Sequence, residues 1–557
     1  MAAALSRRKP EYAGQLQFLT GNCIRCALSK PLWRMPGRSK ALFVDLLNVF
    51  CVTIAMAGAT GSALAEEAVT QKGRLQGSRE AGTTRYLGVP YARPPIGDLR
   101  WRDPQSIEGW SGVRDATRFA PACPQVGVSM PDEPESPTNE DCLYLNIWAP
   151  EAAVRGDQTY PVIVWIPGGG LTNGSTSIPL YDGAALAHRG AIVVTVAYRL
   201  GVLGFLAHPE LTAESGAGGS GNYGLMDQIA ALEWVRENIG AFGGDPDRVT
   251  VAGQSAGATS VSILMASPRA KGLFQRAIGQ SGGLFEPLAL APRYLLENAE
   301  ADGAAYGEAL GAPTLAELRA LPVERLLGDS RADVVVHPVI EPRMLPEPPY
   351  DVFAAGRHND VPLLVGFNAE EALSLTDVSE VTAQNFHERL NERWGALPPA
   401  LLEPYAFATD AEARKARADF ERDLRFGWDI RAWARLAARG QASVHAYYFT
   451  RRPPYAEGSI QQTWGAGHFA ELWYMFDHLD QQPWPWTEAD RQLADDMAGY
   501  WVAFARHGNP NGADRPNWPA FETGDERVMV LDEELKPGEL PNNAALDVFE
   551  RVYDSIR

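Results

Sequence analysis

The feature of this 557-residue sequence that most constrains its fold is the alternation of strand-like and helix-like stretches. The apolar, β-rich runs lie at 160–167, 191–200, 248–253, 361–368 and 443–450. Helical patterns lie between them at 224–244 and 256–268. Such alternation predicts an α/β fold, in which helices cover both faces of a mostly parallel sheet. Sheets of this kind bind ligands at the carboxyl ends of their strands.

The charge balance narrows the classes of partner. The chain has 50 Lys and Arg against 69 Asp and Glu, a net charge of −19. Nucleic-acid binding needs a basic surface, so a nucleic-acid partner is excluded. The sequence has no zinc-type Cys/His spacing, no HExxH and no phosphate-binding GxxxxGK[ST] motif. We therefore expect no metal site.

Residues 1–65 have the layout of a secretory leader. Arg38 and Lys40 supply a positive n-region, and 41–57 is a mostly apolar h-region. An A-x-A cleavage site ends at Ala65. This layout predicts a protein that is secreted or periplasmic after signal-peptide removal.

Two alternatives bear on this leader. A membrane anchor is the first, but Asp45 and Asn48 interrupt a run already marginal in length for a bilayer span. The second concerns the start codon, which could be Met1 or Met35. We find no linker or repeat after the leader, so 66–557 is expected to be a single domain.

Only two cysteines, Cys123 and Cys142, follow the leader. Two cysteines a short loop apart in an exported protein suggest one disulfide. The alternative is a pair of free buried thiols.

Two windows read Gly-x-Ser-x-Gly, one around Ser255 and one around Ser281. A nucleophilic serine on such a motif needs a strand, a very sharp turn and a helix. Ser255 has all three, with Gly253 and Gly257 beside it, and the helix start would point N–H groups at a developing oxyanion. No helix begins after Ser281, which therefore reads as a strand-end or turn serine. The alternative for Ser255 is a glycine-rich turn that merely joins two elements.

A nucleophilic serine needs a histidine base, which follows the acid in chain order when the serine lies on this turn. His468 lies among small residues in "WGAGHFAELW", where its ring could approach a site; a capping role is the alternative. The other histidines beyond residue 300 that we considered read as strand, helix-surface or helix-end residues: His387, His445, His478 and His507.

The acid and the oxyanion donors should follow strands. Glu370 and Glu371 come just after 361–368, and either could orient a histidine, although a helix N-terminal acid is the alternative. Three glycines, 168–170, come directly after the strand at 160–167, and their backbone N–H groups could bind an oxyanion. A flexible loop is the alternative there.

Several long motifs occur in the order found in one family. They are "YLGVPYARPPIGDLRW" (86–101), "EDCLYLNIWAP" (140–150), "VIVWIPGGGL" (162–171), 221–260 with the Ser255 motif, "LFQRAIGQSGG" (273–283), "GFNAEEA" (366–372) and "GAGHFAELWYMF" (465–476). In these motifs the chain resembles the type-B carboxylesterases, which include cholinesterases and bacterial p-nitrobenzyl esterases. The resemblance covers nearly all of 66–557.

The resemblance implies an α/β-hydrolase fold with helical insertions over the active site. It implies that Ser255 is the nucleophile, that His468 is the general base and then acid, and that Glu371 orients His468. It implies no metal or organic cofactor, and its partners would be a small-molecule ester and water, with no obligatory membrane partner.

Further positions are carried over from the same resemblance. The N–H groups of Gly169, Gly170 and Ala256 would form the oxyanion hole. Cys123 and Cys142 would be the family's early disulfide. Ser281 would lie near the triad as a supporting residue.

Some positions depart from the family pattern. Gln254 replaces the usual Glu before the nucleophile, and Phe469 and Ala372 replace glycines beside the base and the acid. Pro167 replaces the His common before the glycines. We expect Leu171, Gln254 and Phe469 to shape the substrate pocket.

The loop between Cys123 and Cys142 carries no aromatic residue that could bind a quaternary ammonium, which disfavours a choline ester. We expect an exported carboxylic-ester hydrolase that forms an acyl-enzyme from small to bulky uncharged or natural-product and xenobiotic esters, including mycotoxin-type esters. One alternative is a lipase on long-chain esters. The other is a non-catalytic, neuroligin-like binding protein, a branch that lacks the nucleophile.

Overall fold

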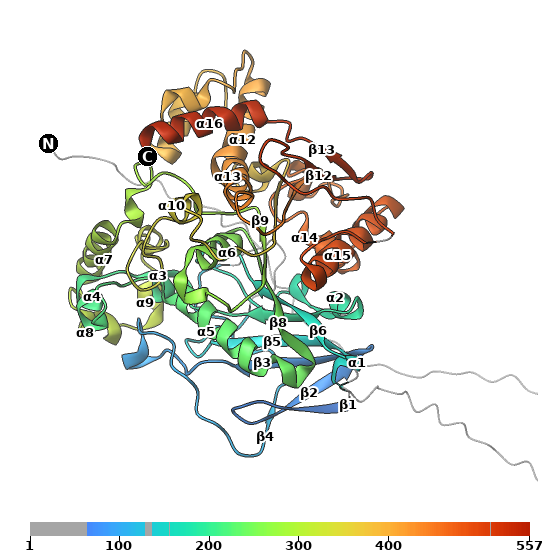
Figure 1. The fold of residues 1–557 in the computed structure, drawn as a ribbon. Coiled ribbons are helices and arrows are strands. Elements are labelled where there is room, and N and C mark those ends of the chain that lie inside the picture. Colours follow the sequence, from blue (N-terminus) through green and yellow to red (C-terminus); the bar gives the residue numbers. More distant parts are fainter. Residues whose placement is uncertain (1–63, 128–135, 155, 157, 513) are drawn as a thin grey trace, which may run out of the picture. The chain divides into compact units, whose positions relative to one another are not determined.

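The computed structural model describes residues 64–127, 136–154, 156, 158–512 and 514–557. A mixed sheet forms the centre of this structure (Figure 1). Its thirteen strands, counted over these residues, are β1 Leu64–Val69, β2 Arg74–Glu80, β3 Thr83–Pro90, β4 Val113–Asp115, β5 Tyr144–Pro150, β6 Tyr160–Ile166, β7 Ile192–Val196, β8 Gly244–Gln254, β9 Arg276–Gln280, β10 Leu363–Asn368, β11 Val444–Phe449, β12 Val528–Leu531 and β13 Lys536–Gly538.

The strand order is β1-β2-β3-β5-β7-β6-β8-β9-β10-β11-β12-β13, with β4 beside β2. From β7 to β12 every neighbouring pair is parallel. The hairpins at both ends and the β5–β7 pair are antiparallel. The mostly parallel sheet predicted from the sequence is therefore confirmed, and all five strand-like runs lie in its parallel part.

Helices fill the connections between the strands. The α-helices of the described residues are α1 Glu151–Val154, α2 Ala184–His188, α3 Gly201–Phe205, α4 Pro209–Ser215, α5 Tyr223–Asn238, α6 Ala256–Ala266, α7 Leu296–Leu310, α8 Leu315–Ala320, α9 Val323–Leu327, α10 Pro349–Ala354, α11 Phe386–Trp394, α12 Asp410–Arg422, α13 Trp428–Ala437, α14 Leu472–Met475, α15 Glu488–His507 and α16 Asn543–Ile556. A π-helical turn, η9 Asp423–Gly427, joins α12 to α13.

The position of β6 between two layers explains why its sequence does not alternate between apolar and polar residues. Val162, Val164 and Ile166 pack in the core cluster that contains residues of α5, α6 and α13. Ile163 and Trp165 point to the opposite face, into the cluster that contains residues of α2 and α15. Because successive side chains of a strand point to opposite faces, a strand covered on both sides must be apolar throughout.

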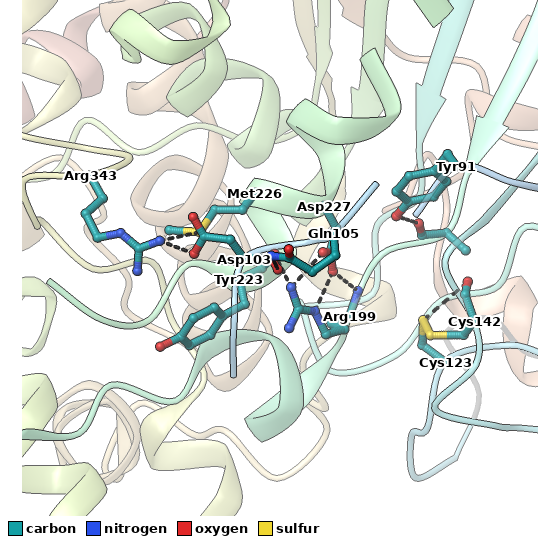
Figure 2. A network of polar contacts seen from close by, with 11 residues as sticks. Tyr91, Asp103, Gln105, Cys123, Cys142, Arg199, Tyr223, Met226, Asp227 and Arg343 are labelled. Carbon is teal, nitrogen blue, oxygen red and sulfur yellow. Dashed lines mark hydrogen bonds and ion pairs between the residues drawn. A yellow bond between two sulfur atoms is a disulfide. The ribbon is translucent and has the colours of Figure 1, made fainter. Parts of the chain in front are cut away.

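A buried ion pair ties the segment after β7 to α5 (Figure 2). Arg199 donates from Nη2 to Asp227 Oδ1 at 2.7 Å and from Nε to Asp227 Oδ2 at 2.8 Å. The backbone N–H of Arg199 also donates to Asp227 Oδ2. Both side chains are buried, so this bidentate geometry offsets the loss of their hydration.

The same view includes the disulfide between Cys123 and Cys142, whose Cα atoms are 5.0 Å apart (Figure 2). This observation agrees with the expected pairing and leaves no free thiol at either position. The disulfide closes a loop with a sequence separation of 19 residues.

Three further findings concern the described residues alone. From residue 64 onward they belong to one compact unit. No helix among them has the length and apolar character needed to cross a membrane. None of their His, Cys, Asp and Glu side chains form a group of three or more able to hold a metal ion. The predicted h-region, 41–57, lies outside the described residues, so the leader stays a prediction.

Candidate active site

Ser255 lies on a strained turn between β8 and α6. Its backbone has φ 56° and ψ −126°, which is a rare conformation for a residue with a side chain. Gly257 is required by space, because a Cβ there would lie 2.1 Å from the carbonyl oxygen of Ile166. A Cβ at Gly253 would lie 2.5 Å from the backbone of Gly257. The sharp strand–turn–helix predicted around Ser255 is confirmed, and both flanking glycines are needed to build it.

Glu371 and His468 form a buried pair at the same edge of the sheet. Glu371 begins the short turn η7 Glu371–Ser374, just after β10, and His468 lies in the loop before α14. His468 Nδ1 and Glu371 Oε2 are 2.6 Å apart, and the backbone N–H of Asn368 donates to Glu371 Oε1 at 2.7 Å. Because an ionised carboxylate only accepts, Nδ1 carries the hydrogen, and Nε2 is the ring nitrogen that has a lone pair.

Glu370, the other candidate acid, points away from His468. Its carboxylate forms a bidentate ion pair with Arg452, at 2.6 and 2.7 Å. It also accepts the backbone N–H of Ala466 at 2.8 Å. Geometry therefore separates the two neighbouring glutamates, which the residues alone left open, and brings Glu371 to His468.

Gln254 occupies a different place from the one expected. We expected it in the substrate pocket, but its side chain is fully buried, with Nε2 3.2 Å from His468 Nε2. Gln254 directly precedes Ser255, so this contact links the imidazole to the residue before the serine. Within the described residues, Ser255 Oγ makes no hydrogen bond of its own.

Two phenylalanine rings hold the imidazole of His468 in place. Phe426 stacks on it with ring centroids 4.8 Å apart and an interplanar angle of 24°. Phe469 meets it edge-on at 4.3 Å. Phe469 has φ 73°, which turns its side chain against the histidine. Phe469 was expected to narrow the pocket, but it packs against His468.

The glycine loop after β6 lies close to the nucleophile turn. A Cβ at Gly168 would lie 2.6 Å from the carbonyl oxygen of Gln254. Gly169 and Gly170 have φ of 106° and 63°, conformations that favour glycine. The N–H groups of Gly169, Gly170 and Ala256, the first residue of α6, have no acceptor among the described residues. Three unpaired donors near Ser255 are what an oxyanion site requires.

A cavity of about 360 Å³ opens beside Ser255. Leu171 lines it, as expected, whereas Gln254 and Phe469 are not among its lining residues. The remaining walls come from segments outside the sheet, including Leu284, Leu290, Val336, Trp394, Leu397, Leu424, Phe426 and Tyr553. Insertions between β9 and β11, together with α16, therefore cover the site, which agrees with the predicted helical insertions.

Ser281 ends β9 and lines the same cavity. Its φ is 52°, and its backbone N–H donates to the carbonyl of Gly366 at 2.8 Å. Its Oγ is buried and has no hydrogen-bond partner among the described residues. The residue therefore lies at a strand end, as predicted, and no base contacts it.

Glu471 is a second buried carboxyl below the triad candidates, and the sequence analysis missed it. Gln280 donates to its Oε1 at 3.2 Å, and Asn368 donates to its Oε2 at 2.5 Å. Burial, with a smaller contribution from the charge of Glu371, raises the pKa of Glu471 to about 8. The available signal was an acidic residue three positions after His468, at the start of an apolar segment.

A parallel sheet with a serine on a strained turn after β8, and a Glu–His pair after β10 and β11, defines an α/β-hydrolase. The family model of the carboxylesterase family matches residues 65–549. The chain therefore belongs to the carboxylesterase family, and the protein is a serine carboxylic-ester hydrolase.

Individual relatives are similar over most of their length. The fumonisin B1 esterase of Sphingopyxis macrogoltabida is 38% identical over 84% of this chain and 87% of its own. The para-nitrobenzyl esterase of Bacillus subtilis (strain 168) is 36% identical over 84% of this chain and 94% of its own. A solved PNB esterase structure has a TM-score of 0.74 at 35% identity, covering 87% of this chain and 99% of that one.

Proposed function

We propose that the protein hydrolyses carboxylic esters through an acyl-enzyme, with Ser255 as nucleophile, His468 as base and then acid, and Glu371 orienting the imidazole. The observation that carries this proposal is the 2.6 Å contact between His468 Nδ1 and Glu371 Oε2 beside the strained Ser255 turn. His468 Nε2 takes the hydroxyl proton as Ser255 Oγ attacks the ester carbonyl, and then gives it to the leaving alkoxide. Water repeats the sequence on the acyl-enzyme and regenerates the serine.

The N–H groups of Gly169, Gly170 and Ala256 stabilise the negative oxygen of each tetrahedral intermediate. This role is supported by the position of the three N–H groups around the serine and by the absence of another acceptor for them among the described residues. Loss of one such donor typically costs about 10²–10³-fold in kcat. Ser281 supports the serine turn from the end of β9.

The substrate class we propose is small to bulky uncharged esters or esters of natural products or xenobiotics, mycotoxin-type esters included. The likeness to a fumonisin B1 esterase supports it. The cavity beside Ser255 is of a size that accommodates a small ligand or part of a larger one.

Hydrolysis of p-nitrophenyl esters from acetate to palmitate tests this function. The purified protein should cleave short esters best, and Ser255→Ala should lose about 10⁴-fold or more in kcat, because the chemical step has no other nucleophile. Ser281→Ala is the matched control, since it removes the serine of the second motif, and should lose less than about tenfold.

Three outcomes would contradict the proposal. Activity that survives in Ser255→Ala but not in Ser281→Ala would reverse the assignment. A sharp rise in rate above the solubility limit of long-chain esters would indicate a lipase. Folded protein without activity on any ester of the series would support a binding protein.

We also propose that residues 1–65 direct export to the periplasm or the medium. The leader layout supports this, as does the disulfide between Cys123 and Cys142, since disulfides persist in oxidising compartments. N-terminal sequencing of protein from cell fractions should find Glu66 as the first residue outside the cytoplasm. Full-length protein retained in the cytoplasm would contradict export.

A further inference from the structure

The cavity beside Ser255 carries five side chains that can be charged: Glu286, Arg293, His337, Arg425 and Asp429. The proposed reaction uses none of them. Charged groups lining a cavity need a partner, because burial of an unpaired charge costs free energy.

Four of the five groups have their charge accounted for. Burial lowers the pKa of His337, which favours the neutral imidazole. Arg293 Nη2 lies 3.4 Å from Glu286 Oε1, and the same carboxylate oxygen accepts the hydroxyl of Tyr294 at 2.8 Å. The charges of Arg293 and Glu286 therefore cancel. Burial raises the pKa of Asp429 well above its ordinary value, which favours the uncharged form of this carboxyl. Arg425 is left as the net charge of the cavity.

Arg425 has no ion-pair or hydrogen-bond partner among the described residues. Its guanidinium lies over two aromatic rings, 5.2 Å from the centroid of Phe426 and 5.9 Å from that of Trp394. Its Nη1 is buried and unpaired. The nearby Arg393 lies 3.6 Å from the carboxylate of Glu421. Burial lowers the pKa of Arg425, and the charge of Arg393 lowers it further, whereas the charges of Glu421 and Glu371 raise it. A guanidinium stays protonated near neutral pH.

The position of Arg425 is unusual as well. It lies on η9, the π-helical turn that interrupts the path from α12 to α13, and such turns are frequent at functional sites. The next residue, Phe426, stacks on His468, so the turn that carries Arg425 also contacts the proposed base. The guanidinium therefore borders the cavity, on a turn whose next residue contacts the proposed base.

We propose that Arg425 binds a carboxylate of the substrate, so that the preferred esters carry a free carboxyl group beside the ester bond. This inference rests on the proposed function and, within its substrate class, selects natural-product and xenobiotic esters that are anionic over uncharged esters. A planar guanidinium matches a carboxylate with two parallel hydrogen bonds, and flanking rings hold it in one orientation. The net charge of −19 repels anions from the protein as a whole, so an anionic ester needs a local cation at its site.

Matched ester pairs test the proposal on the wild-type protein. The monomethyl esters of succinate, glutarate and adipate place a carboxylate at three distances from the ester, and each is paired with the methyl ester of the corresponding terminal amide, which is neutral and of the same shape. We expect kcat/KM for the best carboxylate ester to exceed that of its amide by about 10- to 100-fold. This ratio should fall as salt is added.

Two variants assign the preference to one side chain. Arg425→Gln should bring the ratio of the two kcat/KM values to about one, whereas Arg425→Lys should keep part of it. The double variant Arg293→Gln with Glu286→Gln is the matched control, since it removes the other arginine of the cavity together with the carboxylate that cancels its charge, and it should keep the preference. Thermal unfolding should show no loss of stability in Arg425→Gln, because an unpaired buried charge is removed.

The outcomes separate this inference from the function on which it rests. Equal or faster hydrolysis of the amides by the wild type would overturn the carboxylate site, as would a preference that survives Arg425→Gln. No hydrolysis of either member of any pair, or of p-nitrophenyl esters, would instead overturn the proposed function. Acetyl esters of glycolate and of glycolamide form a further pair, and a preference confined to them would place the carboxylate on the alcohol half of the substrate.

Discussion

Several residues with strained backbone conformations lie around Ser255. Among the described residues, eight non-glycine residues have positive φ, and four of them surround the candidate site: Leu171, Ser255, Ser281 and Phe469. Each such conformation costs about 1–3 kcal/mol, and it persists only where the surrounding structure enforces it. The strain turns side chains toward the cavity or the imidazole, which regular strands and helices would not do.

The pairing of Glu371 with His468 leads to a direct test. Glu371→Gln keeps the shape of the side chain but removes the charge that orients the imidazole and stabilises its protonated form, so kcat should fall by about 10²–10⁴-fold. Steady-state hydrolysis of p-nitrophenyl acetate is the measurement. Glu370→Gln is the matched control, because Glu370 pairs with Arg452, and it should change kcat by less than about threefold. A larger loss in Glu370→Gln than in Glu371→Gln would contradict the pairing.

The limits of prediction at this scale have physical causes. The turn at Ser255 could be predicted because its sequence pattern is local: a strand, two glycines and a helix. Glu370 and Glu371 are neighbours on one turn, and their difference comes from Arg452 and His468, which lie far along the chain. The place of Phe469 depends on a positive φ, which residue type does not reveal.

Elements of secondary structure were predictable where they are regular. The apolar runs correspond to strands, and α6 ends before Pro268 as expected. The helix expected over 224–244 is shorter, because α5 ends at Asn238 and a tighter turn, η3 Ile239–Phe242, leads to Gly243 at φ 79°. The π-helical turn η9 has no simple sequence pattern, so the wall that carries Arg425 could not be predicted.

The link between α5 and the segment after β7 depends on one ion pair. Asp227→Asn would leave Arg199 buried without a counter-charge, and the free energy of unfolding should fall by about 3–5 kcal/mol. Urea unfolding followed by circular dichroism measures this loss. Asp480→Asn, which removes the carboxylate of an exposed pair with Arg491, is the control and should change stability little. Equal effects in the two variants would show that burial of the Arg199–Asp227 pair is of no consequence.

At the scale of the whole molecule, the buried carboxyl of Glu471 couples stability to pH. Its pKa is raised from 4.5 to about 8, so the folded protein holds a proton that the unfolded chain releases. Its contribution to stability is complete below about pH 4.5 and is lost as the pH rises to about 8. One proton corresponds to about 1.4 kcal/mol per pH unit within this window.

Glu471→Gln should remove that slope. The free energy of unfolding of the wild type should decline relative to that of the variant between about pH 5 and pH 8, because glutamine has no proton to lose. Denaturant unfolding at several pH values measures the difference between the two curves. Parallel curves over this range would mean that Glu471 is already ionised in the folded protein.

The order along the chain of the strands that carry the candidate site has a consequence for when activity can appear. His468 and Glu371 are 97 residues apart in the chain, and the serine turn precedes both. Contacts between such distant segments form late in folding, because long loops must close before they gain any stabilisation. A nascent chain that has released β8 but not β11 therefore has the serine and no base to activate it. The proposed ester hydrolysis is therefore a property of the finished molecule alone, and a chain that is still being synthesised has no means of attacking an ester.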